Sequence, residues 1–466
     1  MRRLQLVAFF LILLIALVGC QTAPGMLLTL EVLPVSGNTV YRFQLQPGQS
    51  GPLTLPSSNR LALIFLGNAP STPFQFRIQG DALPQGEAAY TESGRRMERS
   101  AKLPLSTSVS RSTQAVKEVE VFWVNKGNSD PSGDGDVERT ARLRVTSKNA
   151  YFYLDPDPAK PILDSQIQKL ADAFDNTIYP QLTKEFGQEP KPGIDGEDRL
   201  FVVISPAVDN FGSEKGLLGY FWSRDALPNQ IHSNRKEVIF LSPRIFNYPN
   251  YTCFGTLAHE FTHLIVFNQK TLRNGVPEDT WLNEGFAMLG MDLCGYGLKG
   301  GNADVARDIG VFLDAPQSFS LTEWASNPRG FSYGLSYLFC RYFYDRYPEG
   351  PRDAMRAGAA GVSGIERVLS TKGLEFSSFF ADWAVATYLS GSGVSVDPRF
   401  TYASGVDLRG RYGSVQLNGV HTQSQTGLTG NLRPWSASFY LFDGPREWQF
   451  DLRADRLLGG AAVRLN

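Results

Sequence analysis

The chain has 466 residues. A single hydrophobic core usually serves a shorter chain, so this length favours two or three domains. The 45 Lys and Arg residues nearly balance the 46 Asp and Glu residues, and a net charge of -1 excludes an overall field that would attract nucleic acid. Four cysteines in so long a chain exclude a small disulfide framework, and 42% hydrophobic residues exclude wholesale disorder.

The N-terminal residues have the pattern of an export signal. Two arginines precede an apolar run over residues 6–18, which is short for a membrane-spanning helix. The run ends in Leu17-Val18-Gly19-Cys20, which resembles the bacterial lipobox. The resemblance implies a lipoprotein signal peptide over residues 1–20, lipidation of Cys20, and a lipid anchor on the extracytoplasmic face of the bacterial cell envelope. A plain signal peptide cut near Ala23, or an uncleaved anchor, is the alternative.

Residues 21–147 have the pattern of an all-β domain. Short apolar runs alternate with turn residues from Met26 to about Leu143, and apolar and polar side chains alternate over 41–45. We interpret this region as a β-sandwich-like domain. The Asp-rich segment 128–136 lacks the spaced ligands and the closing glutamate of an EF-hand, so we interpret it as a solvated loop and not as a calcium site.

Residues 148–390 have the order of an α+β domain, for which we expect a mixed sheet. Apolar residues three to four positions apart over 163–178 predict an amphipathic helix that ends near Pro180. Beyond Gly391, frequent Gly and Ser and two strand-like runs predict a small C-terminal β module over 391–466. Within the α+β region, the first helix is followed by strand-like runs at 200–204, 218–222 and 237–241. A largely helical pattern then extends over 336–389.

The segment His259-Glu260-Phe261-Thr262-His263 indicates a metal-binding site. Residues four apart on a helix lie about 40° apart around its axis, so both imidazoles can ligate one metal ion. An apolar stripe lies roughly opposite the two histidines, so one side of the helix can enter a core while the other faces a cleft. The chain has only four histidines, and two of them bracket a glutamate at this spacing by chance on the order of once in several hundred cases.

A catalytic zinc ion needs a third protein ligand and one open position. The segment Trp281-Leu282-Asn283-Glu284-Gly285 follows His263 and offers a carboxylate, so we interpret Glu284 as the third ligand. A competing zincin pattern places a third histidine six residues after the second one, where this chain has Gln269. Cobalt or manganese would also bind such donors, but zinc suits them best.

On these two segments the chain resembles the gluzincin metallopeptidases, and within them the hyicolysin-type family of extracellular neutral metallopeptidases. The resemblance is firm over about residues 251–293 and looser over 151–389, and it does not cover the first domain or the last seventy or so residues. It implies a zincin-type catalytic domain over 148–390, with a mixed sheet and an active-site helix, inside a multidomain protein.

The motif and the resemblance together predict a zinc-dependent endopeptidase that acts on proteins or peptides. Two neutral imidazoles and one carboxylate leave the zinc ion with net positive charge, which activates a water molecule. Glu260 is then the general base that takes the proton of this water and passes it to the leaving amine. Gluzincins commonly place a Tyr or His downstream of the third ligand to stabilise the oxyanion, which makes Tyr333 the candidate and Tyr337 the alternative.

Other details of the site stay open from sequence. Some gluzincins have an Asp four residues after the ligand glutamate, but this chain has Met288 there, and Asp292 is rotated off that face of the helix. We interpret His232 and His421 as ordinary surface histidines. If Cys20 is lipidated, three cysteines remain and permit at most one internal disulfide, whose pair the sequence does not choose: Cys253, Cys294 and Cys340.

Two other functions compete with an endopeptidase. An aminopeptidase usually has an upstream Gly-x-Met-Glu-Asn type segment that binds the free amine of the substrate, and none precedes His259. A surface lipoprotein could instead bind a partner through its β modules and keep an inactive zinc site, but such a protein would often have lost Glu260 or one histidine. For an endopeptidase, we expect an edge strand within 216–222 to pair with the extended substrate backbone.

Overall fold

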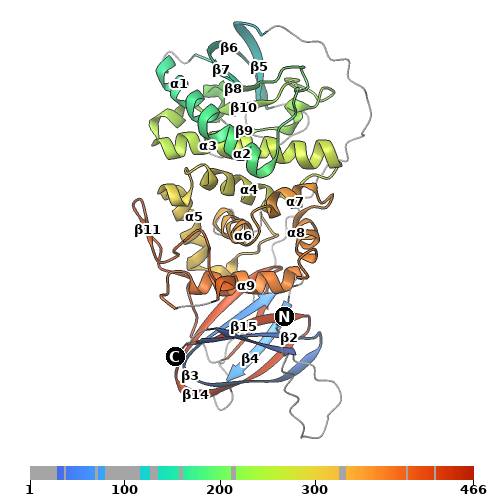
Figure 1. Ribbon diagram of the computed structural model, residues 1–466, viewed down its shortest axis with the longest axis vertical. Coiled ribbons are helices and arrows are strands. Elements are labelled where there is room, and N and C mark those ends of the chain that lie inside the picture. The colour runs from blue at the N-terminus through green and yellow to red at the C-terminus, as the bar shows by residue number, and fades with distance from the viewer. Residues whose placement is uncertain are drawn as a thin grey trace, which may run out of the picture.

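The computed structural model describes residues 29–35, 38–68, 72–78, 116–125, 135–156, 161–210, 217–324, 332–394, 397–424 and 427–465. The predicted signal peptide, Cys20 and most of the Asp-rich segment 128–136 lie outside the described residues. Within these ranges, no helix has the length and apolar character needed to cross a membrane. The molecule has a sheet at each end and a layer of helices between them (Figure 1). The prediction of a multidomain protein with mixed sheets and helices is therefore confirmed.

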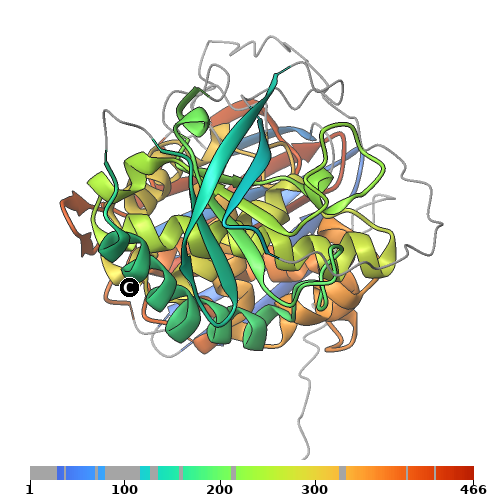
Figure 2. The same ribbon diagram turned by 90° about the horizontal axis from the view of Figure 1, so that it is seen from above.

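A six-stranded sheet forms the upper end of the molecule, in the order β5-β6-β7-β8-β10-β9. It is mixed, because β7, β8 and β10 are parallel to one another while β5, β6 and β9 pair antiparallel. Figure 2 shows β5 and β6 (cyan) lying across the top of the molecule, above the helices. The strands are β5 (Val119–Asn125), β6 (Asp136–Thr146), β7 (Ala150–Leu154), β8 (Leu200–Ile204), β9 (Gly219–Phe221) and β10 (Val238–Leu241).

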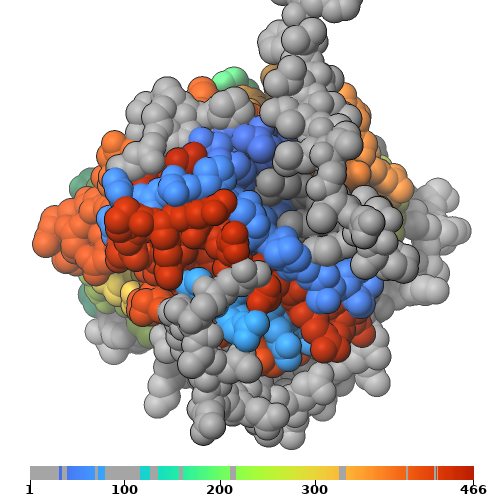
Figure 3. All heavy atoms as spheres, turned by 90° about the horizontal axis from the view of Figure 1, so that it is seen from below, coloured from blue at the N-terminus to red at the C-terminus, as the bar shows by residue number. Residues whose placement is uncertain are grey.

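A seven-stranded sheet forms the lower end, in the order β1-β2-β15-β3-β14-β4-β13. From β2 to β13, strands from the two ends of the chain alternate in it. Figure 3 shows the N-terminal (blue) and C-terminal (red) segments side by side on the lower face. The strands are β1 (Thr29–Val35), β2 (Asn38–Leu45), β3 (Gln49–Gly67), β4 (Thr72–Ile78), β13 (Gly427–Leu432), β14 (Ser436–Ala454) and β15 (Leu458–Leu465).

The strand pairing differs from the chain-order division into a β-sandwich-like domain over 21–147 and a separate module over 391–466. β15 lies between β2 and β3, and β14 lies between β3 and β4, so neither set of strands forms a continuous sheet without the other. β5 and β6, which fall within 21–147, belong to the upper sheet because β6 pairs with β7. Apolar alternation predicts where a strand lies but not its partner, which explains the difference.

Strand β3 shows how the lower sheet joins the rest of the molecule. Residues 61–66 of β3 are all buried. Alternate side chains, such as Leu63 and Phe65, pack in a core enclosed by the sheet itself, and their neighbours, such as Ile64, enter the main core. Helix α9 (Phe376–Leu389) covers this second face (Figure 1), and Arg42 of β2 forms an ion pair with Asp382 of α9 at 3.3 Å.

Between the two sheets lie the helices that carry the site. The amphipathic helix predicted over 163–178 continues to residue 186, so the predicted end near Pro180 is wrong. Proline is tolerated there because it lies in the first turn of α2, after a π-helical turn. The helices are α1 (Asp164–Ala173), η1 (Phe174–Ile178), α2 (Tyr179–Phe186), α3 (Asn250–Val266), η5 (Phe267–Leu272), α4 (Thr280–Leu293), α5 (Ala303–Asp314), α6 (Tyr333–Arg346), α7 (Gly350–Arg356), α8 (Gly361–Ser370) and α9.

Candidate metal centre

Helix α3 presents both histidines of the motif on one side. The ring centroids of His259 and His263 lie 4.7 Å apart. The predicted apolar stripe on the opposite side is buried, and Phe261 within it packs against Phe174 at 5.1 Å and Tyr179 at 5.5 Å. The apolar contacts thus fix the rotation of α3, and the imidazoles turn toward α4.

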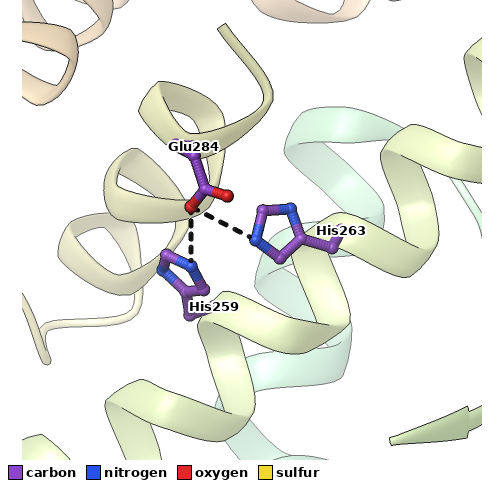
Figure 4. A group of neighbouring side chains, drawn as sticks. All are labelled: His259, His263 and Glu284. Atoms are coloured by element: carbon purple, nitrogen blue, oxygen red, sulfur yellow. Dashed lines mark ion pairs between the residues drawn. The ribbon is translucent and has the colours of Figure 1, made fainter. Parts of the chain in front are cut away.

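Helix α4 places Glu284 against the two imidazoles (Figure 4). One carboxylate oxygen, Oε2, lies 3.2 Å from Nε2 of His259 and 3.5 Å from Nε2 of His263. Among the described residues, these three are the one group of His, Cys, Asp or Glu side chains whose ligand atoms all lie within 4.8 Å of one another. The structure therefore brings together the three residues that the sequence predicts as metal ligands.

The donor set fits a zinc ion. Oε2 of Glu284 is buried and makes no hydrogen bond, although two ring nitrogens lie beside it. Ligand atoms of a tetrahedral zinc site with bonds of about 2.0 to 2.2 Å lie roughly 3.3 Å apart. The separations of 3.2 Å and 3.5 Å from Glu284 to the two imidazoles match this value. Two imidazoles and a carboxylate are also the donors of known catalytic zinc sites.

The charges within this group favour an ionised carboxylate. Burial by itself raises the pKa of Glu284, but the neighbouring His263 and His259 outweigh burial and hold that pKa well below its ordinary value. Burial by itself lowers the pKa of His263, but Glu284 outweighs it and raises that pKa to about 9. A metal ion that binds here therefore displaces a proton from His263 at neutral pH.

Glu260 lies on α3 between the two histidines and reaches the upper sheet. Its Oε2 accepts a hydrogen bond of 2.9 Å from the backbone N–H of Phe221 in β9. Burial raises the pKa of Glu260, which the two histidines partly oppose. β9 is an edge strand, so the prediction of an edge strand within 216–222 is confirmed for Gly219–Phe221. The hydrogen bond between Phe221 and Glu260 could not be predicted from the sequence, because the two residues are far apart in the chain.

The two candidate tyrosines have different surroundings. Tyr333 begins α6, and its ring centroid lies 6.4 Å from that of His259 and 4.8 Å from that of Trp324. Tyr337 is fully buried, and its hydroxyl donates a hydrogen bond of 3.0 Å to Asp292 of α4. The structure therefore brings Tyr333 to the metal-ligand group, while the hydroxyl of Tyr337 is engaged elsewhere.

The structure also shows the surroundings of the two other histidines and of the three cysteines. His421 is exposed, as expected, but His232 stacks on Trp123 at 3.8 Å and lies 3.0 Å from Asp136, so it is not an ordinary surface residue. Its ring is held by an aromatic neighbour and a carboxylate that lie far away in the sequence. The three cysteines in the described residues are free and buried, so the disulfide that their number permits does not form: Cys253, Cys294 and Cys340.

The fold and the three converging side chains define an α+β protein with a candidate metal centre between its upper sheet and its helical layer. No protein-family model matches the chain. The chain is similar to the neutral metalloprotease ShpI of Staphylococcus hyicus, with 28% identity over 271 residues, or 54% of this chain and 58% of that protein. It thus spans somewhat more than half the length of the curated relative that it matches. This similarity supports a relationship to a family of metallopeptidases.

Proposed function

We propose that the chain is a zinc-dependent endopeptidase that hydrolyses peptide bonds in proteins or peptides. The observation that carries this proposal is the approach of Glu284 to His259 and His263, with Glu260 on the same helix as the two histidines. The similarity to a neutral metalloprotease supports peptide-bond hydrolysis as the reaction. A zinc ion bound by these residues supplies a Lewis acid that activates water and polarises a carbonyl oxygen.

Glu260 is the general base in this proposal. The N–H of Phe221 holds one of its carboxylate oxygens, which fixes the orientation of the group next to the metal ligands. Burial raises the pKa of this carboxyl toward the range in which it can accept a proton from water and release it to the leaving amine.

The edge strand β9 is the proposed binding site for the substrate backbone. Leu218 faces β10, since its carbonyl accepts a hydrogen bond from Ser242, so the backbone groups of Gly219 and Phe221 point away from β10. The N–H of Phe221 already donates to Glu260, so an extended peptide can pair with the other outward backbone groups of this edge, those of Gly219 and the carbonyl of Phe221. The peptide then lies beside Glu260. This mode places an internal peptide bond at the site, as an endopeptidase requires.

Tyr333 is the proposed donor to the oxyanion. It contacts the metal-ligand group through His259, and a phenol there can donate a hydrogen bond to the carbonyl oxygen as negative charge develops on it. The ring of Trp324 packs edge-on against Tyr333 and limits the directions in which the phenol can turn.

The proposed location is the extracytoplasmic side of a bacterial membrane, with a lipid anchor at Cys20. This part rests on the sequence pattern of residues 1–20 alone. We expect the full-length protein to fractionate with membranes and to carry lipid on an N-terminal Cys20, which mass spectrometry of the mature N-terminus can detect. A Cys20→Ala variant that remains in the membrane fraction to the same extent would argue against the anchor.

Glu260→Gln tests the proposed reaction directly. The purified protein should cleave casein, lose this activity with a zinc chelator and regain it when zinc is restored. The variant should retain one zinc ion per chain but lose at least about 10³-fold in kcat, because the general base is absent. Zinc-loaded wild-type protein that cleaves no protein or peptide substrate would instead favour a surface protein that binds a partner with an inactive zinc site.

A further inference from the structure

Helices α4 and α6 are joined by buried polar contacts behind the candidate metal centre. Asp292 lies two turns after Glu284 on α4, and Tyr337 lies one turn after Tyr333 on α6. The Tyr337 hydroxyl donates to Oδ2 of Asp292 at 3.0 Å, and Nη1 of Arg341 lies 3.4 Å from the same oxygen. The side chain of Asp292 is fully buried, so this contact cannot be exchanged for water without opening the interface.

The same two helices approach closely next to Glu284. A Cβ atom added to Gly285 would lie 2.5 Å from Sγ of Cys340 and 3.0 Å from the backbone oxygen of Ser336, both on α6. At the start of α6, a Cβ added to Gly334 would lie 2.3 Å from the backbone oxygen of Asp308 on α5. The first turn of α6, which carries Tyr333, is thus packed closely between α4 and α5.

We propose that Asp292 and Tyr337 are positioning residues, whose hydrogen bond fixes α6 on α4 so that Tyr333 lies over the metal-ligand group. This inference rests on the proposed endopeptidase function. Glycine packing sets the distance between the helices but permits them to slide or rotate, whereas a directional hydrogen bond selects one register. Tyr333 and Tyr337 lie one turn apart, about 6 Å along the axis, so any displacement of Tyr337 is passed on to Tyr333.

Arg341 does not account for the burial of Asp292 by itself. Its guanidinium already pairs with Asp345, with Nε of Arg341 at 2.9 Å and Nη2 at 2.5 Å from the same carboxylate oxygen. Asp345 in turn accepts hydrogen bonds from the backbone and hydroxyl of Ser404, which anchors the far end of α6. Of the two contacts that Asp292 makes with α6, the hydrogen bond from Tyr337 at 3.0 Å is shorter than the contact with Arg341 at 3.4 Å.

Tyr337→Phe is the sharpest test, because it removes one hydroxyl and keeps the buried ring. Tyr342→Phe is a matched control: Tyr342 is also buried on α6, and its hydroxyl donates at 2.5 Å to the backbone of Arg399, away from the site. At a temperature where all variants are folded, we expect Tyr337→Phe to lower kcat about 10-fold and the control less than twofold. Zinc affinity and KM should change less than twofold in both variants.

A double variant separates positioning from general destabilisation. If Tyr337 acts through Tyr333, then Tyr337→Phe should have almost no further effect on kcat in a Tyr333→Phe background, where kcat is already about 10²-fold lower. Binding of a phosphinic peptide, which carries a tetrahedral oxyanion, should weaken about 10-fold in Tyr337→Phe, while zinc binding is unchanged. This second measurement does not depend on turnover.

Three outcomes would overturn the inference: an unchanged kcat in Tyr337→Phe, an equal loss in Tyr342→Phe, or full additivity with Tyr333→Phe. If Tyr337→Phe does not fold, Asp292→Asn replaces it, and unchanged kcat and phosphinic-peptide affinity in that variant would likewise overturn the inference. Zinc-loaded wild-type protein without proteolytic activity would remove the proposed function itself, and this result is distinct from an active wild type with an unaffected Tyr337→Phe.

Discussion

The two sheets of the molecule are assembled in different ways. Every strand of the upper sheet comes from residues 119–241. Helix α3, which carries His259, Glu260 and His263, is the next α-helix in the chain. The lower sheet alternates strands from the two chain ends, so Arg60 of β3 pairs with Asp443 of β14, 383 residues away. The upper sheet and helix α3 thus come from one continuous stretch of the chain, whereas the lower sheet joins the two ends of the chain beneath the helical layer.

The candidate site depends on both halves of this arrangement. His259, His263 and Glu260 lie on α3, under the upper sheet, while Glu284 and Tyr333 lie on helices of the central layer. Helix α9 of that layer rests in turn on the lower sheet. A metal ion bound at the site would therefore connect the upper part of the molecule to the layer that the lower sheet supports.

Removal of residues 391–466 should have the largest effect. The truncation deletes β13, β14 and β15, so β3 loses both neighbours and its buried side chains become exposed. Exposure of several large apolar side chains costs about 2 kcal/mol each, more in sum than a domain's stability. We expect an insoluble or protease-sensitive product in limited proteolysis. A soluble 1–390 fragment with a cooperative unfolding transition would show that the lower sheet is dispensable.

Glu284→Ala tests whether a metal ion connects α3 to α4 through the carboxylate of Glu284. The variant removes one of three proposed ligands, so we expect zinc affinity to fall at least about 100-fold in competition with a chelating dye. Glu323→Ala is the control, because Glu323 is a partly exposed carboxylate that pairs with Arg433. Equal zinc affinity in the Glu284 variant and the control would exclude Glu284 as a ligand.

Gly285→Ala tests the packing of the central layer. The added methyl group meets Cys340 and the backbone of Ser336, so we expect a loss of about 1 to 3 kcal/mol in urea-induced unfolding, despite the higher helix propensity of alanine. A second substitution, Cys340→Ala, should restore part of this loss because it removes the nearest atom. A Gly285→Ala variant as stable as the wild type would show that α4 and α6 can separate at little cost.

The buried carboxyl of Asp225, which lies just after β9, should make the stability of this region depend on pH. Burial raises the pKa of this carboxyl to about 7, although hydrogen bonds from Asn234 oppose the shift. Because its folded pKa lies above its unfolded value, Asp225 stabilises the fold at low pH, and this contribution is lost as pH rises from about 4 through 7. Asp225→Asn should therefore reduce the fall in unfolding free energy over this range, by about 1 kcal/mol or more.

The control for this pH experiment is Asp443→Asn, whose side chain is largely exposed. Burial also raises the pKa of Glu237, to about 7, so we expect the Asp225 variant to reduce the slope and not to abolish it. Identical pH profiles for the wild type and Asp225→Asn would contradict the assigned burial effect.

The parts of the site that sequence could predict are those set by helical periodicity. The spacing of His259 and His263 places both rings on one side of a helix, and the apolar residues opposite them indicate which side is buried. The inference of Glu284 follows from the need of a catalytic zinc ion for a third ligand, and that of Tyr333 from the family resemblance, since no local rule relates separate helices. The structure places Glu284 against both imidazoles and Tyr333 beside His259.

The parts that sequence could not predict depend on contacts between distant segments. Nothing in the pattern of β15 indicates that it pairs between β2 and β3, because alternation specifies a face and not a partner. The stacking of His232 on Trp123 and the bond from Tyr337 to Asp292 likewise join segments whose proximity only the folded chain reveals.

A crystal structure of the zinc-loaded protein, with anomalous diffraction data at the zinc edge, would show directly whether His259, His263 and Glu284 bind the metal ion together. We expect one strong peak within about 2.0 to 2.2 Å of Nε2 of His259, Nε2 of His263 and a carboxylate oxygen of Glu284. A zinc peak elsewhere, or a peak between the two imidazoles with Glu284 turned away, would contradict this expectation.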